Sequence, residues 1–197
     1  MKNILLSGVG GQGTVLASRI IAQVAMEKGF FARTAETIGM AQRGGCVVSH
    51  VRIGEGSPSS MIPLGGADVL IGFEPGEAVR CLPWLKPDGV VIVSDLAIQP
   101  VTGALSGVRF EGAPAVEFLK RHASRVVVVD AEKVFRETGS DKVLNVALLG
   151  AAMAAGALDA NRDEILHVLA ARLPEKLLAI NEKALLLGAE SVGGTKA

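Results

Sequence analysis

Of the 197 residues, 24 are glycine and none is tyrosine. Hydrophobic residues make up 49% of the chain, and 20 basic residues balance 20 acidic ones. The charge balance gives no electrostatic footprint for nucleic acid or for an anionic membrane surface, and the aliphatic content excludes intrinsic disorder. The length indicates one domain, which we place at residues 1–190, followed by a flexible tail at 191–197.

The cysteines and histidines limit the cofactors that the chain can hold. Cys46 and Cys81 are its two cysteines, whereas an iron–sulfur cluster normally takes four thiolates. The three histidines show no zinc-ligand spacing. No apolar run reaches the roughly 20 residues that a membrane-spanning helix needs. We therefore expect no metal site, no membrane contact, and a reduced, cytoplasmic protein.

Short apolar runs alternate with segments of helical periodicity, which predicts an α/β fold. Strands are expected at residues 2–7, 30–35, 46–53, 68–73, 89–94 and 125–130. Helices are expected at residues 14–28, 76–82, 115–122, 141–158, 162–172 and 175–188. The pattern predicts a three-layer, Rossmann-like arrangement in which helices cover both faces of a sheet and a helical segment closes the C-terminal end.

The strand at residues 46–53 has a pattern of its own. Polar and apolar residues alternate along it, which suits a half-exposed or antiparallel strand better than a buried parallel one. About ten residues separate it from the strand before, fewer than a parallel crossover usually takes. We therefore expect a mixed sheet, in which the usual dinucleotide-binding half is interrupted.

The segment GVGGQG at residues 8–13 follows the first strand and opens the first helix. In this context, glycines permit a tight turn and leave the N–H groups of the helix N-terminus open to an anion such as pyrophosphate. Glu36 follows Gly13 by 23 residues, near the distance at which an acidic residue binds the ribose of a dinucleotide. The same glycines would equally serve a tight turn without any ligand, so both interpretations stay open.

A second segment, GMAQRGG at residues 39–45, places an arginine between glycines. Arg43 is a permanent cation with five donors, and Gly44 and Gly45 leave the backbone beside it open to a phosphate, a carboxylate or a partner chain. The alternative interpretation is a solvated arginine beside a flexible hinge.

Several single residues carry more modest expectations. Cys46 and Cys81 are expected in the core. His50 and Arg52 share one face of their strand, which is either an interface or a solvated polar surface. Glu74, directly before Pro75, is expected to cap a helix N-terminus.

Together, GVGGQG and GMAQRGG resemble the motifs of the gamma-type subunits of 2-oxoacid:ferredoxin oxidoreductases. The resemblance extends to VRIG at residues 51–54 and FEP at residues 73–75, and it covers residues 1–190 in all. The form GMAQRGG, with the FEP-x-EA turn, is most similar to the beta subunits of indolepyruvate ferredoxin oxidoreductases within that family.

The resemblance implies a subunit, not catalytic alone, of a complex that oxidatively decarboxylates an arylpyruvate to an acyl-coenzyme A. Thiamine diphosphate and iron–sulfur clusters are expected on a larger partner subunit, because this chain has two cysteines and no Gly-Asp-Gly motif. Coenzyme A and ferredoxin are expected to act through the complex. We expect no catalytic residue here. The ligand- or partner-binding residues are expected to be Gly8, Gly10, Gly11, Gln12, Gly13, Arg43, Gly44 and Gly45.

Two other functions stay open from the sequence. A self-sufficient NAD(P)-binding oxidoreductase would use the glycine loop and Glu36. A nucleotide-binding scaffold would have no redox role. Homodimerisation of the isolated chain and the identity of the 2-oxoacid are also left open.

Overall fold

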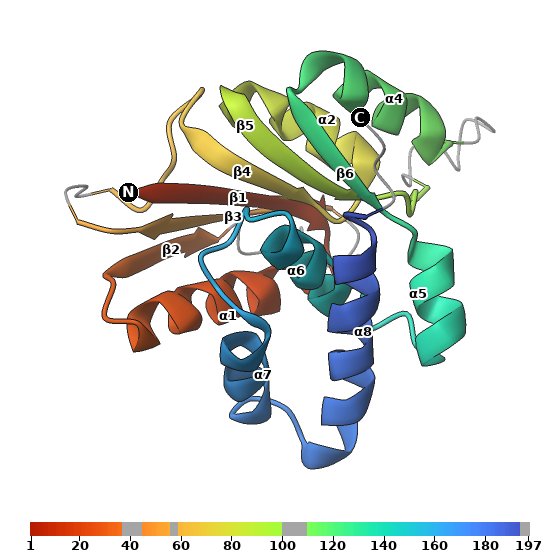
Figure 1. The fold of residues 1–197 in the computed structure, drawn as a ribbon. Helices are drawn as coiled ribbons and strands as arrows, with labels where there is room; N and C mark the ends of the chain where they lie inside the picture. Colours follow the sequence, from red (N-terminus) through yellow and green to blue (C-terminus); the bar gives the residue numbers. More distant parts are fainter. Residues whose placement is uncertain (37–44, 56–58, 100–109, 194–197) are drawn as a thin grey trace.

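One mixed β-sheet organises residues 1–36, 45–55, 59–99 and 110–193, which the computed structural model describes (Figure 1). Its strands lie in the order β2-β3-β1-β4-β5-β6. Their bounds are β1 Lys2–Val9, β2 Ala32–Glu36, β3 Cys46–Ile53, β4 Ala67–Gly72, β5 Leu85–Ser94 and β6 Arg125–Val129. β1 pairs in parallel with β4, β4 with β5 and β5 with β6, whereas β3 is antiparallel to both β1 and β2. The predicted mixed sheet and antiparallel strand are confirmed.

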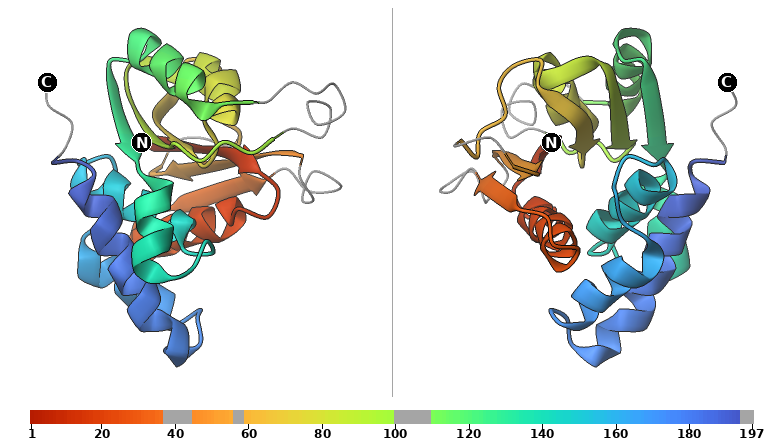
Figure 2. Two further views of the ribbon diagram at one scale, coloured as in Figure 1. Left: turned by 90° about the vertical axis from the view of Figure 1, so that its right-hand side faces the viewer. Right: turned by 60° about the vertical axis from the view of Figure 1, so that its left-hand side comes forward.

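Helices cover both faces of this sheet (Figures 1 and 2). On one face lie α1 Thr14–Glu27, α5 Ala131–Thr138, α6 Leu144–Ala154, α7 Arg162–Ala170 and α8 Leu178–Glu190. On the other face lie α2 Pro75–Cys81, which runs into the 3-10 turn η2 Leu82–Trp84, and α4 Gly112–His122. A second 3-10 turn, η3 Glu175–Leu177, leads into α8. The expected three-layer α/β fold with its helical C-terminal segment is confirmed.

Helix α5 was not among the expected helices, although its end signals are present in the sequence. Asp130 precedes it and accepts a hydrogen bond from the Lys133 N–H at 2.8 Å. Gly139 ends it with a φ of +73°. Both are ordinary helix-end residues. Since the segment between them is only two turns long and mostly polar, its periodicity is too short to stand out.

Strand β5 begins earlier than expected. It was expected to begin at residue 89, but it begins at Leu85, so Pro87 and Asp88 lie inside the strand. The register against β4 shifts there, since Leu85 pairs with Ala67 and Val90 pairs with Val69. The extra residues of β5 form an irregular stretch, which is where a strand tolerates proline and glycine.

Alternate residues of β1 belong to two separate cores. Ile4 and Leu6 are fully buried against the face that carries α1 and α6, whereas Leu5 is buried on the face that carries α2 and α4. This follows from the two-residue period of a strand. Because both faces of β1 are covered, the turn that follows it is held in place from both sides.

Helices α6 and α8 cross at two glycines. A Cβ atom added to Gly150 would collide with the carbonyl oxygen of Leu185, and one added to Gly188 would collide with that of Ala147. The two backbones are therefore in direct contact, which only glycine permits. Among the described ranges, neither α6 nor any other helix is long and apolar enough to cross a membrane.

Candidate functional site

The glycine loop leaves the sheet at the carboxyl end of β1. The strand continues through Gly8 to Val9, so the loop itself begins at Gly10 and ends at Gly13, which precedes α1. Phe73, directly after β4, lies beside it, since its N–H donates to the Ser7 carbonyl at 2.8 Å. The loop therefore occupies the edge where ligands bind in open α/β sheets.

Gln12 braces this loop with both ends of its side-chain amide. Its Oε1 accepts from the Val9 N–H at 2.7 Å, and its Nε2 donates to the Phe73 carbonyl at 3.0 Å. Gly8 makes room for the brace, because a Cβ there would lie 2.8 Å from both Gln12 Oε1 and Phe73 Cβ. The sequence suggested a main-chain donor at Gln12. The structure shows that its side chain ties β1 to the end of β4.

Two of the loop glycines have backbone conformations that other residues rarely adopt. Gly11 has a φ of +103°, and the space that a side chain would take there is open. Gly13 has a φ of +84° and is the N-cap residue of α1, and a Cβ there would lie 2.9 Å from Asn145 Nδ2 of α6. The space beside Gly11 is therefore unoccupied, whereas Gly13 is the point at which the start of α1 contacts α6.

The main-chain donors of the loop fall into two groups. The Gly10 N–H donates to the Gly45 carbonyl at 2.9 Å, and the Gln12 N–H donates to the Val9 carbonyl at 3.2 Å. Within the described ranges, the N–H groups of Gly11 and Gly13 donate to no other residue, and no side chain caps α1. An anion would therefore meet Gly11, Gly13 and the first turn of α1 rather than all five residues of the motif.

The two glycine motifs converge at this edge. The Gly10–Gly45 hydrogen bond joins them, and Val9 pairs with Cys46, the residue after the second motif. Arg43 and Gly44 lie outside the described residues, so their expected role stays a prediction. The antiparallel pairing of β1 with β3 is what brings Gly45 to the loop.

Glu74 lies at the same edge and caps α2, as expected. Its Oε2 accepts from the Glu77 N–H at 2.8 Å, and the residue is 3% exposed. Its Oε1 is buried without a hydrogen-bond partner in the part of the chain that is described, as are Glu77 Oε2 and Ser7 Oγ. Burial raises the pKa of the Glu74 carboxyl.

The two cysteines are placed differently from each other. Cys81 is buried, as expected, and burial raises the pKa of its thiol to about 11. Cys46 is exposed, so the expectation of a core position is wrong. It is the first residue of β3 and pairs with Val9, the last residue of β1, so it lies at the margin of the sheet rather than in its core. Desolvation of the thiol and its hydrogen bond with Glu77 raise the pKa of Cys46 to about 12, so it stays protonated.

The strand face that holds His50 and Arg52 is not a solvated surface. His50 is 5% exposed, and its Nδ1 accepts from the Ile62 N–H at 3.2 Å. Arg52 donates to Asn3 Oδ1 and to the Met61 carbonyl, both at 3.0 Å. The chain after β3 folds back over this face. Burial lowers the pKa of His50, so it is neutral near pH 7.

The side chains do not fit an iron–sulfur cluster. Cys46 and Cys81 provide two of the four thiolates that such a cluster normally takes. Among the described residues, no three histidine, cysteine, aspartate or glutamate side chains gather in a way that could hold a metal ion. We therefore derive no electron-transfer step through this chain.

The dinucleotide interpretation fits the sheet poorly. In a Rossmann fold the second strand lies next to the first, whereas here β3 lies between β1 and β2. Glu36, the ribose candidate, accepts from Ser18 Oγ at 3.0 Å and forms an ion pair with Arg19 at 3.8 Å. Its carboxylate is thus engaged by α1, one strand further from the glycine loop than a ribose contact requires.

The fold and the loop define a class: an α/β domain with a glycine-rich turn after β1 and an antiparallel strand that interrupts its first half. A family model described as pyruvate ferredoxin/flavodoxin oxidoreductase matches residues 3–191. The chain belongs to this family, and the resemblance noted from its motifs is confirmed.

Relatives support the same placement. The indolepyruvate oxidoreductase subunit IorB of Archaeoglobus fulgidus is 36% identical over 187 residues, covering 94% of this chain and 92% of that protein. The pyruvate/ketoisovalerate oxidoreductases common subunit gamma of Pyrococcus abyssi is 30% identical over 153 residues, covering 77% and 76%. The crystal structure of a keto/oxoacid ferredoxin oxidoreductase gamma subunit from Geobacter sulfurreducens has a TM-score of 0.69 at 23% identity, covering 99% of this chain and 100% of that chain. This structure supports the fold.

Proposed function

We propose that the chain is a subunit, not catalytic alone, of a 2-oxoacid ferredoxin oxidoreductase, and that the complex converts an arylpyruvate such as indolepyruvate to its acyl-coenzyme A. The observation that carries the proposal is the similarity to IorB along more than nine tenths of both chains. The similarity to the pyruvate/ketoisovalerate gamma subunit is lower and shorter, which favours the aryl substrate.

A larger partner subunit would hold thiamine diphosphate and the clusters. This assignment is supported by the cysteines of this chain, which are two in number. One of them is exposed on β3 and the other is buried in α2. Thiamine diphosphate would supply the electron sink for decarboxylation on that partner. The present chain would complete the complex, as a single domain over residues 1–190.

The glycine loop would contribute the contact to coenzyme A or to the partner. Gly11 and Gly13 have open N–H groups at a helix N-terminus, which suits a phosphate or carboxylate. Gly8, Gly10, Gln12 and Gly45 would hold the loop in shape. Arg43, with Gly44, would add the permanent positive charge that pairs with the anion.

Co-expression with the larger subunit tests the proposal. The complex should co-elute in size-exclusion chromatography and reduce ferredoxin in the presence of indolepyruvate and coenzyme A, and more slowly with pyruvate or 2-oxoglutarate. Ferredoxin reduction by the larger subunit alone at the same rate would refute a role for this chain. Faster turnover of pyruvate would refute the aryl substrate.

Arginine substitutions test the site itself. Arg43→Ala should raise the KM for coenzyme A at least tenfold, which corresponds to about 1.4 kcal/mol, or should weaken assembly by as much. Arg172→Ala, at an exposed arginine of the C-terminal segment, is the matched control and should change neither quantity. Micromolar binding of NADH to the isolated chain would instead favour a dinucleotide enzyme.

A further inference from the structure

A cavity of about 440 Å³ lies at the opposite end of β1 from the glycine loop. It lies between α1, α6 and the chain that leads into α7. Its volume is in the range of small-molecule sites, whereas close-packed cores rarely leave voids larger than a water molecule. Its walls are mostly apolar and include Ile4, Ile20, Ile21, Val24, Leu149 and Ile165.

Two carboxylates reach the cavity, and both are already engaged. Asp68 accepts from the Asn3 N–H at 2.7 Å through Oδ2, and its Oδ1 pairs with Lys86. Asp159 forms an ion pair with Lys28, with Oδ1 and Nζ 3.8 Å apart. Neither carboxylate is therefore left to attract a cationic ligand.

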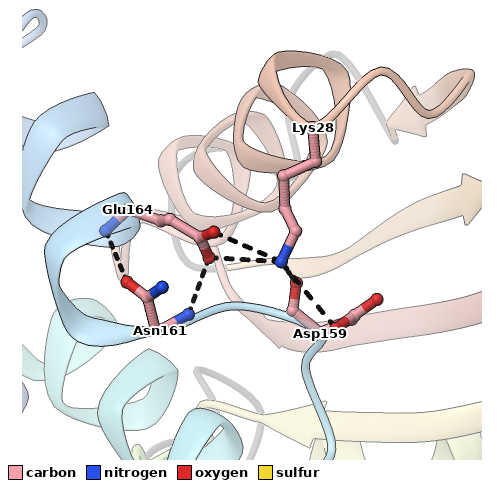
Figure 3. A network of polar contacts seen from close by, with 4 residues as sticks. All are labelled: Lys28, Asp159, Asn161 and Glu164. Atoms are coloured by element: carbon pink, nitrogen blue, oxygen red, sulfur yellow. Dashed lines mark hydrogen bonds and ion pairs between the residues drawn. The ribbon is translucent and has the colours of Figure 1, made fainter.

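The wall on the α7 side is fixed by a polar network (Figure 3). Lys28, at the end of α1, donates to the Asp159 carbonyl at 3.1 Å and lies 3.3 Å from Glu164 Oε1. Glu164 and Asn161 complete a capping box at the start of α7. Because this network joins the end of α1 to the start of α7, the wall formed by Asp159 and Ala160 is fixed without a ligand.

Lys2 brings a positive charge to this cavity. It alternates with Asn3 along β1, so its side chain lies on the same face as Ile4 and lines the cavity. Within the described ranges, its ammonium group forms no hydrogen bond or ion pair. The site therefore combines an apolar interior with the positive charge of the Lys2 ammonium group.

We propose that this cavity binds a small monocarboxylate with an aliphatic or aromatic body, the carboxylate paired with Lys2 and the body buried between α1 and α6. The charge arrangement selects this ligand class: an amine would meet carboxylates that are already paired, and a neutral molecule would leave Lys2 unpaired. The site is separate from the glycine loop, since the two lie at opposite ends of β1.

Calorimetric titration of the full chain with three eight-carbon probes tests the proposal. Octanoate should bind with a dissociation constant below about 1 mM, a modest affinity for a ligand of this size. Octanol and octylamine, which match its length, should bind at least tenfold more weakly. Equal binding of all three, or no binding of octanoate, would overturn the proposal.

Variants locate the binding. Lys2→Met should weaken octanoate binding about tenfold and leave octanol binding unchanged, whereas the control Lys142→Met, at an exposed lysine, should change neither. Ala25→Leu, which fills the cavity from α1, should abolish binding. Ala160→Leu at its rim is the second filling variant, in case the first one disturbs folding. Retained octanoate binding in a folded filling variant would place the probe elsewhere and refute the site.

Octanoate binding to the assembled complex distinguishes a small-molecule site from a cavity that receives a side chain of a partner subunit. If the cavity serves a small carboxylate, octanoate should bind the complex as it binds the isolated chain. Loss of binding on assembly would mean that a partner's apolar side chain occupies the cavity, and the proposal would fail.

Discussion

The glycine loop and the α6–α8 crossing use the same residue type for opposite purposes. At the crossing, Gly150 and Gly188 lack side chains so that two backbones can touch. In the loop, Gly11 has a φ of +103° and a side chain there would face open space, and within the described ranges its N–H group donates to no other residue. Gly150 and Gly188 allow two helix backbones to come into contact, whereas Gly11 leaves the space beside the loop unfilled.

The comparison shows that glycine content by itself does not report function. A helical glycine costs about 0.5–1 kcal/mol relative to alanine, so its presence in α6 and α8 requires a gain, which the close packing of the two helices supplies. A loop glycine with positive φ is explained by its backbone conformation alone, which other residues rarely adopt. Helical and loop glycines are distinguished by the atoms that an added side chain would contact.

The largest expected effect is at the crossing. Gly188→Ala would force apart the backbones of α6 and α8, and should lower the free energy of unfolding by about 3 kcal/mol, the upper range for overpacking. Urea unfolding followed by circular dichroism measures this. Leu186→Ala on the exposed side of α8 is the control and should cost little. A Gly188→Ala variant as stable as the control would contradict the direct contact.

The brace of the glycine loop should come next. Gln12→Leu leaves the Val9 N–H and the Phe73 carbonyl without their partners, so it should cost about 2 kcal/mol. Gln23→Leu, at a glutamine whose hydrogen bond to Glu27 is exposed, is the matched control and should be nearly neutral. If both substitutions cost the same in urea unfolding, Gln12 does not hold the loop.

Gly11→Ala separates the contribution of the loop to stability from its contribution to function. Its cost should be about 1 kcal/mol, from the positive φ alone, because the space around it is open. Activity of the assembled complex, measured as ferredoxin reduction, should fall by more than this change in stability would explain. Unchanged activity in a folded Gly11→Ala variant would remove the loop from the proposed contact with coenzyme A or the partner.

The smallest expected effect is pH-dependent and belongs to the loop region. Because burial raises the pKa of Glu74, its stabilising contribution is complete below the usual carboxyl pKa and is lost as the pH rises through the raised value. Glu74→Gln should therefore gain stability relative to the parent as the pH rises from 4 to 7.5, by less than any of the changes above. Thermal unfolding across this range measures the difference. The exposed control Glu175→Gln should show no such trend, and a gain at low pH would contradict the sign.

Much of the fold could be predicted from local patterns. The alternation along residues 46–53 indicated an antiparallel strand, and β3 is one. The paired motifs indicated the family, and the family model matches nearly the whole chain. These predictions succeeded because periodicity and short motifs depend on residues that are close in sequence.

Other features depended on which segments meet. His50 looked like half of a polar strand face, yet the chain around Ile62 covers it. Cys46 looked like a core residue, yet it is exposed at the margin of the sheet, where it pairs with Val9. Gln12 looked like one more loop residue, and its partner Phe73 is 61 positions away. No local pattern could report these contacts.

By itself, the sequence determined the alternation of strands and helices, the positions of the glycine motifs, and the family. Only the tertiary structure decided that Gly10 and Gly45 meet, that Gln12 ties the loop to the end of β4, and that Lys2 lies beside an apolar cavity. The physical reason is that backbone preference and periodicity act over a few residues, whereas burial, charge pairing and the shape of a cavity arise between segments that only the folded sheet brings together.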